Sequence, residues 1–219
     1  MLHKFFNIHC LTHRVIIGKL TFNIIKHRLK ITSSDWFGTH MLTPILAEFA
    51  ILHPGITVEL ITEARFFNLS RREADLAFRI SPFKEPDVVS RKLLHMPYGV
   101  YARKGMKRKI GVDGKGASLI ALDTGFAGAP DDSWLQKKLP KAKVVFRSNS
   151  RDVQAKMCQH GTGTSVLPVP LGERLVSVER IKLGDEPTGR DTWVGYHRDL
   201  SRLARLRALL DLVIKRLAG

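Results

Sequence analysis

The feature that most restricts the fold of this chain is an alternation of two hydrophobic patterns between Leu29 and Ile80. Short apolar runs predict strands at residues 29–33, 56–62 and 74–80. Between the first two runs, a face of apolar residues at helical spacing comprises Met41, Leu42, Ile45, Leu46, Phe49 and Leu52. His53-Pro54-Gly55 ends this helix, and a second, short helix is predicted near residues 66–73. Strands and helices in strict alternation predict a parallel α/β sheet.

A second α/β unit follows. Its strands are predicted at residues 98–102, 118–122, 143–147 and 164–167. Its helices are predicted at residues 134–139 and, capped by Ser150, up to Gly161. A final helix at residues 199–218, capped by Asp199, is expected to lie along the sheet of the first unit.

Charge and composition limit the classes of function. The 219 residues include 36 Lys and Arg and 20 Asp and Glu, so the net charge is +16, which is compatible with a polyanionic partner such as nucleic acid. The basic residues lie in several clusters without interleaved aromatic residues, which weakens that interpretation. No apolar run reaches the roughly 18–20 residues of a membrane span, so no membrane partner is expected. Two cysteines, Cys10 and Cys158, exclude a disulfide scaffold and favour a cytoplasmic protein.

Signals for an enzyme or a metal site are weak. Gly161-Thr162-Gly163 ends a helix, whereas a dinucleotide-binding fingerprint opens one. Ser165 lacks the glycines of a nucleophile elbow. His9, Cys10 and His13, within the atypical basic segment 1–28, lack a fourth metal ligand. We therefore predict no catalytic residues, no metal and no cofactor.

Several phrases, by their order and spacing, carry a resemblance to a known family. They are Leu42-x-Pro44-x-Leu46-x-x-Phe49-x-x-x-His53-Pro54, Leu69–Arg79, Arg147-Ser148-Asn149-Ser150, Gly161-x-Gly163-x-x-x-Leu167-Pro168 and His197-Arg198-Asp199-Leu200. With them, residues 29–219 resemble the effector-binding domain of LysR-type transcriptional regulators.

The resemblance implies an α/β fold with two lobes, like the type-2 periplasmic binding proteins. Crossovers are then expected near residues 90–100 and 168–172, with residues 29–97 plus 171–219 in lobe I and residues 98–170 in lobe II. It also implies a homodimer to which the first-lobe helix contributes Phe49 and Leu52. Promoter DNA would be contacted only through a winged helix-turn-helix, which residues 1–28 do not resemble. A stand-alone solute-binding module of the same fold is the alternative function.

Ligands of such a fold bind beyond the carboxyl ends of the strands, between the lobes. Two helix N-termini are expected there, and such termini favour anions because their backbone N–H groups are unpaired. We therefore expect a small anionic effector, with the candidate residues Ser33, Ser34, Asp35, Arg79, Thr124, Ser148, Asn149 and Ser150. The serines and Asn149 could instead serve only as caps of their own helices. Arg79 could clamp a carboxylate or merely lie solvated at the end of its strand.

Overall fold

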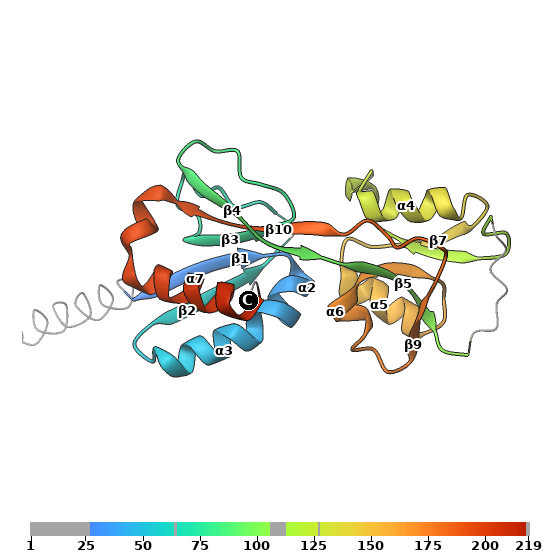
Figure 1. The fold of residues 1–219 in the computed structure, drawn as a ribbon, viewed down its shortest axis with the longest axis horizontal. Coiled ribbons are helices and arrows are strands. Elements are labelled where there is room, and N and C mark those ends of the chain that lie inside the picture. Colours follow the sequence, from blue (N-terminus) through green and yellow to red (C-terminus); the bar gives the residue numbers. More distant parts are fainter. Residues whose placement is uncertain (1–26, 64, 106–112, 127, 218–219) are drawn as a thin grey trace, which may run out of the picture.

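The computed structural model of the chain describes residues 27–63, 65–105, 113–126 and 128–217. They form two α/β lobes that lie side by side and are joined by two extended segments (Figure 1). The predicted two-lobed α/β architecture is therefore confirmed. The prediction for segment 1–28, including His9, Cys10 and His13, lies outside the described residues except for His27 and Arg28.

The first lobe contains a five-stranded sheet with the order β2-β1-β3-β10-β4. Strand β1 pairs in parallel with β2 and β3, which confirms the parallel arrangement predicted from the alternating pattern. Strand β10 runs antiparallel between β3 and β4. The strands are β1 (Arg28–Ser33), β2 (Thr57–Thr62), β3 (Leu76–Arg79), β4 (Val88–Met96) and β10 (Arg190–His197).

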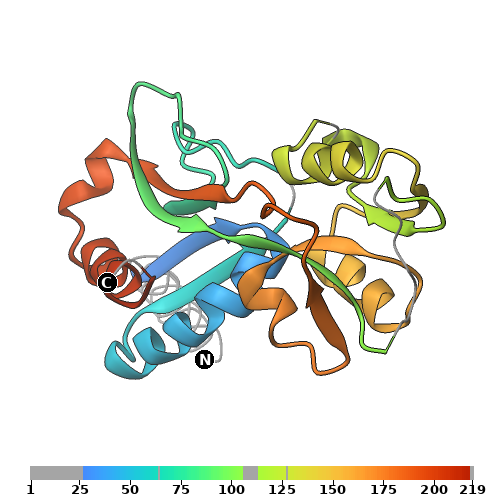
Figure 2. The ribbon, with the colours of Figure 1, turned by 45° about the vertical axis from the view of Figure 1, so that its right-hand side comes forward.

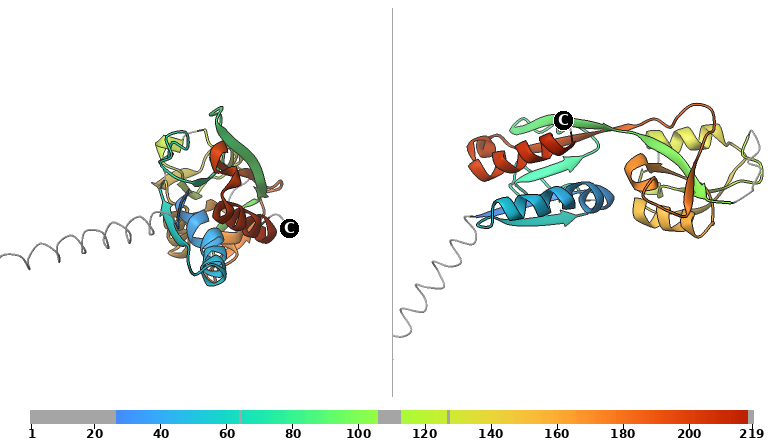
Figure 3. Two further views of the ribbon diagram at one scale, coloured as in Figure 1. Left: turned by 90° about the vertical axis from the view of Figure 1, so that its left-hand side faces the viewer. Right: turned by 60° about the horizontal axis from the view of Figure 1, so that its bottom comes forward.

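Two helical segments cover this sheet, one that follows β1 and one that follows β10. The first runs without interruption from Asp35 to Leu52, as a helical turn, a π-helical turn and an α-helix. Its α-helix packs beside the C-terminal helix α7 (Figure 3). The elements are α2 (Asp35–Phe37), η1 (Gly38–Leu42), α3 (Thr43–Leu52), the 3-10 segment η3 (Arg198–Arg202) and α7 (Ala204–Leu217).

The second lobe contains an antiparallel sheet, β8-β5-β9, and a parallel pair, β6-β7. A bridge between Leu119 and Thr164 links the pair to the chain that enters β8. The strands are β5 (Tyr98–Arg103), β6 (Ser118–Ala121), β7 (Lys143–Arg147), β8 (Ser165–Pro168) and β9 (Val178–Ile181). The helical elements are η2 (Thr124–Phe126), α4 (Pro130–Lys138), α5 (Arg151–Gln159) and α6 (Val169–Gly172).

The two lobes are connected by β4, which continues through Pro97 into β5, and by β10, which returns to the first lobe (Figure 2). Strands β4 and β10 pair along their whole length, from Met96 opposite Arg190 to Val88 opposite His197. The register shifts once, between Thr192 and Trp193. The lobes are therefore joined at a paired, two-stranded ribbon.

The first crossover agrees with the expected region near residues 90–100, but the second one differs from the predicted residues 168–172. Strand β9 still pairs with β5, so the chain remains in the second lobe through this strand. It returns only with β10. The boundary predicted at residue 171 was therefore placed too early, because β9 is a four-residue strand with little alternation of its own.

The helix predicted near residues 66–73 is wrong, because this segment forms turns. Asn68 Oδ1 accepts a hydrogen bond from the Arg71 backbone N–H at 3.0 Å, and Glu73 Oε2 accepts one from the Asn68 N–H at 2.9 Å. Arg72 adopts a positive φ of 55°. Side chains that bond to nearby backbone groups compete with helical hydrogen bonds, which explains the difference.

The final helix begins later than predicted. Residues Arg198–Arg202 form a 3-10 segment, and α7 starts at Ala204. The cap also differs, because His197 Nδ1 accepts the hydrogen bond of the Asp199 N–H at 3.2 Å. The expected packing of this helix on the first lobe is confirmed by its contacts with α3 and β4.

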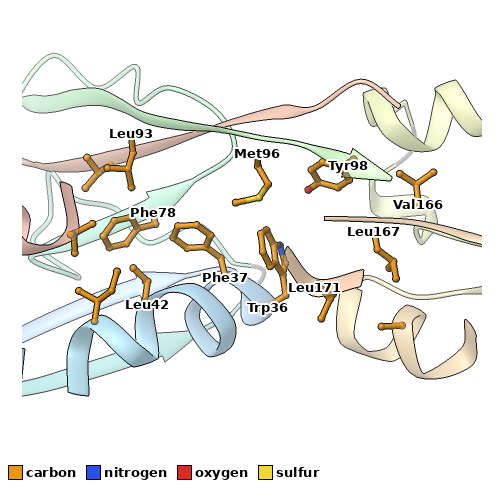
Figure 4. Packing of buried hydrophobic residues seen from close by; sticks show 14 of the residues in the cluster. Trp36, Phe37, Leu42, Phe78, Leu93, Met96, Tyr98, Val166, Leu167 and Leu171 are labelled. Carbon is orange, nitrogen blue, oxygen red and sulfur yellow. The ribbon is translucent and has the colours of Figure 1, made fainter. Parts of the chain in front are cut away.

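The hydrophobic core runs through both lobes and across the junction between them. Leu42, Phe78 and Leu93 pack inside the first lobe, and Val166 and Leu167 pack inside the second (Figure 4). Phe49 is 0% exposed and belongs to this core. It therefore cannot contribute to a dimer surface as expected, whereas Leu52, 59% exposed, remains available.

Replacing Phe49 with alanine should lower the free energy of unfolding by about 3–5 kcal/mol, because the lost ring leaves a cavity that the core cannot fully close. Val176→Ala is the matched control, since Val176 is 85% exposed and its truncation should change stability by less than about 0.5 kcal/mol. Denaturant unfolding of both variants measures the difference. Equal losses would contradict the core position of Phe49.

Candidate ligand-binding site

A cavity of about 300 Å³ lies between the two lobes. The first lobe contributes residues at the carboxyl ends of β1, β2 and β3, and the second contributes the start of α5. Tyr98 and Arg190, at the points where the chain passes between the lobes, also line it. This is the position in which open α/β sheets bind ligands.

The structure brings most of the predicted site residues to this cavity. Those that line it are Ser33, Ser34, Asp35, Arg79, Asn149 and Ser150. Thr124 and Ser148 are not among its lining residues, although Phe126, at the end of η2, is. Ser148 Oγ instead accepts a hydrogen bond from the Ser150 N–H at 3.1 Å, and so shapes the turn that leads into α5.

Three serines differ in how their hydroxyl groups are used. Ser150 Oγ caps α5 by accepting from the Val153 N–H at 3.4 Å, and it also donates to Asp35 Oδ2 across the lobes at 3.2 Å. Ser33 Oγ donates to the Ser34 carbonyl at 3.0 Å. Ser34 occupies the cap position of its helix but makes no side-chain capping bond. The capping interpretation therefore holds for Ser150 and not for Ser34.

The first helix starts unusually close to the end of the sheet. A Cβ atom on Gly38 would lie 2.4 Å from Thr62 Cγ2 and 2.6 Å from Ser33 Oγ. Only a glycine allows this approach, which brings the helix start and the end of β1 to the same side of the cavity.

Arg79 is largely engaged with its own lobe. Its guanidinium donates to the Phe67 carbonyl and lies 3.7 Å from a Glu85 carboxylate oxygen. It also stands over the rings of Phe66 and Phe83, at 4.9 and 4.3 Å from their centroids. Burial lowers the pKa of Arg79, although an arginine remains protonated at neutral pH. These contacts hold the loop after β2 against β3.

Aromatic side chains form much of the cavity wall and were not predicted as site residues. Trp36, Phe37, Phe66, Phe67, Phe78, Tyr98 and Phe126 all line it. Trp36 and Phe37 pack edge to face at 5.6 Å between centroids. Figure 4 shows Trp36 in the space between the lobes, with Tyr98 on the strand that enters the second lobe. The signal was present in the sequence, because Trp36-Phe37 and Phe66-Phe67 are aromatic pairs that follow predicted strands.

Two buried arginines were also missed. Arg151 and Arg190 line the cavity, and each donates to one carboxylate oxygen of the fully buried Asp131. Arg151 donates further to Gln154 Oε1 and to the Val166 carbonyl, both at 3.0 Å. Burial lowers the pKa of both guanidiniums. No local pattern marks these two residues among the many basic residues of the sequence, since they meet only in the folded chain.

Additional contacts hold the lobes together beside the cavity. His40, in the first helical segment, lies with Nε2 2.6 Å from Asp152 Oδ1 of α5. The His40 carbonyl accepts a hydrogen bond from Arg174 Nη1 at 3.1 Å. With the Asp35–Ser150 bond, these contacts connect the first helical segment to the second lobe.

Among the described residues, no group of three or more His, Cys, Asp or Glu side chains could hold a metal ion. Burial raises the pKa of the Cys158 thiol to about 12, which keeps it protonated and unreactive. No helix in the described part of the chain is long and apolar enough to cross a membrane.

These features, a two-lobed α/β fold with a ligand-sized cavity between the lobes, define the class of small-molecule-binding domains with the type-2 periplasmic-binding-protein fold. A family model, the LysR substrate binding domain, matches residues 25–218, and the chain belongs to this family. The resemblance found in the sequence is therefore confirmed.

Individual relatives are distant. The chain is 24% identical over 165 residues to the Mau operon transcriptional activator of Paracoccus denitrificans, a match that covers 75% of this chain and 56% of that protein. The chain thus spans little more than half of the length of this curated relative. The regulatory domain of CrgA, a LysR-type transcriptional regulator from Neisseria meningitidis, is similar with a TM-score of 0.73 at 20% identity, over 87% of this chain and 98% of that chain. The regulatory domain of AphB from Vibrio vulnificus is similar with a TM-score of 0.66 at 20% identity, over 86% and 97% of the two chains. These likenesses support the same fold.

Replacing Asp131 with asparagine should lower the free energy of unfolding by about 3–5 kcal/mol, because two buried guanidiniums would lose their shared carboxylate. Asp185→Asn serves as the control, since Asp185 forms an exposed ion pair with Lys138 and its loss should cost much less. Denaturant unfolding at neutral pH compares the two. A loss for Asp131→Asn no larger than that of the control would show that the cluster contributes little to stability.

Proposed function

We propose that the chain is the effector-sensing domain of a LysR-type transcriptional regulator and binds a small anionic molecule in the cavity between its lobes. The single observation that carries the proposal is that this cavity is built from both lobes at the carboxyl ends of the first-lobe strands, in a chain of this family. Promoter DNA is a partner only through a helix-turn-helix module, and the setting that fits such a regulator is the cytoplasm.

A ligand that contacts both lobes would stabilise their closed arrangement, because it binds that arrangement better than an open one. Ser33 and Ser34 approach the cavity from one lobe, and Asn149 and Ser150 from the other. We propose that closure is transmitted through the geometry of a homodimer. The family is one of regulatory domains, and we propose no catalytic activity for this chain.

A stand-alone solute-binding module of the same fold remains the alternative. The two functions differ in what ligand binding changes. A regulator's sensing domain, fused to a helix-turn-helix module, should alter operator binding in a gel-shift experiment when ligand is added. A solute-binding module should bind ligand with no effect on DNA binding.

Ser34→Ala and Asn149→Ala should each weaken the binding of a small carboxylate by roughly 5- to 150-fold, because a removed donor leaves a ligand oxygen unpaired in a partly dry cavity. The ligand is first identified by thermal-shift screening of small carboxylates, and titration calorimetry then measures the variants. Thr124→Ala, outside the cavity lining, is the matched control. Parent-like affinity of both variants would contradict the proposed donors.

The proposed homodimer should depend on the exposed apolar residues of α3. Ile51 is 80% and Leu52 is 59% exposed on this helix. Ile51→Asp should shift the chain toward monomer at tens of micromolar, since a charge would have to be buried in the interface. Light scattering measures this shift, and Val176→Asp is the control on an exposed residue elsewhere. A parent chain that is already monomeric at that concentration would contradict the dimer.

A further inference from the structure

The cluster of Arg151, Asp131 and Arg190 carries one more positive than negative charge. Both oxygens of Asp131 are used, one by each guanidinium. The neighbouring Asp132 accepts instead from the Leu122 N–H at 3.2 Å and from Gln136 Nε2 at 2.7 Å. Its charge acts on Arg151 through space, without a hydrogen bond to either arginine. The direct contacts of the cluster therefore leave one guanidinium charge without a carboxylate of its own.

The other two arginines that line the cavity have separate partners. Arg65 lies 3.6 Å from a carboxylate oxygen of Glu63, and Arg79 lies 3.7 Å from one of Glu85. Among the arginines that line the cavity, Arg151 and Arg190 are therefore the two that share a single carboxylate.

Arg190 is the member of the pair that makes fewer hydrogen bonds, since only its Nη2 donates to Asp131. Its Nε is buried and has no hydrogen-bond partner among the described residues. The residue is 9% exposed and lines the cavity. Arg151, by contrast, already donates to Asp131, Gln154 and the Val166 carbonyl.

The rest of the cavity favours a flat, apolar ligand body. Trp36, Phe37 and Phe78 line it from the first lobe, and Phe126 lines it from the second. Aromatic rings stack on such walls face to face or edge to face. At about 300 Å³, the cavity is at the small end of the range for ligand pockets. One ring with a short substituent matches this size.

The cavity also disfavours a second anionic group. Asp35 lines the cavity and is exposed. Among the described residues, its carboxylate accepts a side-chain hydrogen bond from the neutral Ser150 hydroxyl and from no cationic side chain. A second carboxylate on the ligand would have to share the cavity with this like charge. One anionic group can pair with the guanidinium that lacks a carboxylate of its own, whereas a second one would have no such partner.

We propose that the cavity binds an aromatic monocarboxylate, with its carboxylate beside the Arg190 guanidinium and its ring between the aromatic walls. Arg151 and Asp131 act as positioning residues that fix the Arg190 guanidinium. This inference rests on the proposed effector-sensing function and names the chemical class of the effector.

The first experiment compares simple probes on the whole chain by titration calorimetry. Benzoate and phenylacetate should bind at least about tenfold more tightly than benzamide, because the neutral amide leaves the guanidinium charge unpaired. They should also bind more tightly than acetate, which lacks the ring, and terephthalate, which has a second carboxylate. Equal binding of benzoate and benzamide, or preferential binding of terephthalate or acetate, would overturn the inference.

The second experiment places the carboxylate at Arg190. Arg190→Lys keeps a positive charge but removes the planar guanidinium donors, and it should reduce the benzoate-to-benzamide affinity ratio by about tenfold. Arg207→Lys, on the exposed side of α7, is the matched control and should keep the ratio of the parent. An unchanged ratio in Arg190→Lys would overturn the assignment. If this variant does not fold, the ligand series on the parent chain decides.

The outcomes separate this inference from the proposed function. If the chain binds none of the aromatic carboxylates but binds another carboxylate in the wider thermal-shift screen, the ligand class is refuted and the sensing function is not. If the isolated chain binds benzoate with the expected selectivity but the DNA binding of the fused regulator responds to no ligand, the sensing function is refuted and the ligand class is not.

Discussion

The buried carboxylate of Asp131 is the contact on which the arrangement around the cavity depends. It lies in the first turn of α4, and its two oxygens bind the first residue of α5, Arg151, and the first residue of β10, Arg190. One side chain thus ties two helices of the second lobe to the strand that returns to the first lobe. Both guanidiniums also lie over the Tyr98 ring, at 5.4 and 5.8 Å from its centroid. Because the other crossover begins the second lobe at Tyr98, both connections between the lobes meet at this cluster.

Much of the fold could be predicted from the sequence, because its signals are local. The strands at β1, β2 and β3 and the long first helix were recognisable from spacing and β-branched residues alone. The turns at residues 66–73 could not be predicted in the same way, since the deciding interactions are side-chain bonds of Asn68 and Glu73 to backbone groups. The short β9 was missed because its pairing with β5 joins residues far apart in the chain.

For the site, too, only the residues with a local sequence signal could be predicted. Strand ends that open helices placed Ser33, Ser34, Asn149 and Ser150 at the cavity, because carboxyl ends of parallel strands meet at one edge of a sheet. The arginine pair could not be found, since Arg151 and Arg190 are brought together only by a shared partner. The two kinds of residue lie in one cavity, with hydroxyl and amide groups beside the helix starts and guanidiniums beside the crossover.

The continuous pairing of β4 with β10 has a mechanical consequence. The last pair of this ladder, Met96 opposite Arg190, lies at the boundary between the lobes, so both connecting segments are held as one ribbon up to that point. Any rotation of the lobes must then be taken up beyond it, at Pro97 and in residues 182–189 between β9 and β10. Proline restricts φ at the first of these positions. The pivot therefore lies beside Arg190, so in any rotation of the lobes this end of the cavity moves least and the far ends of the lobes move most.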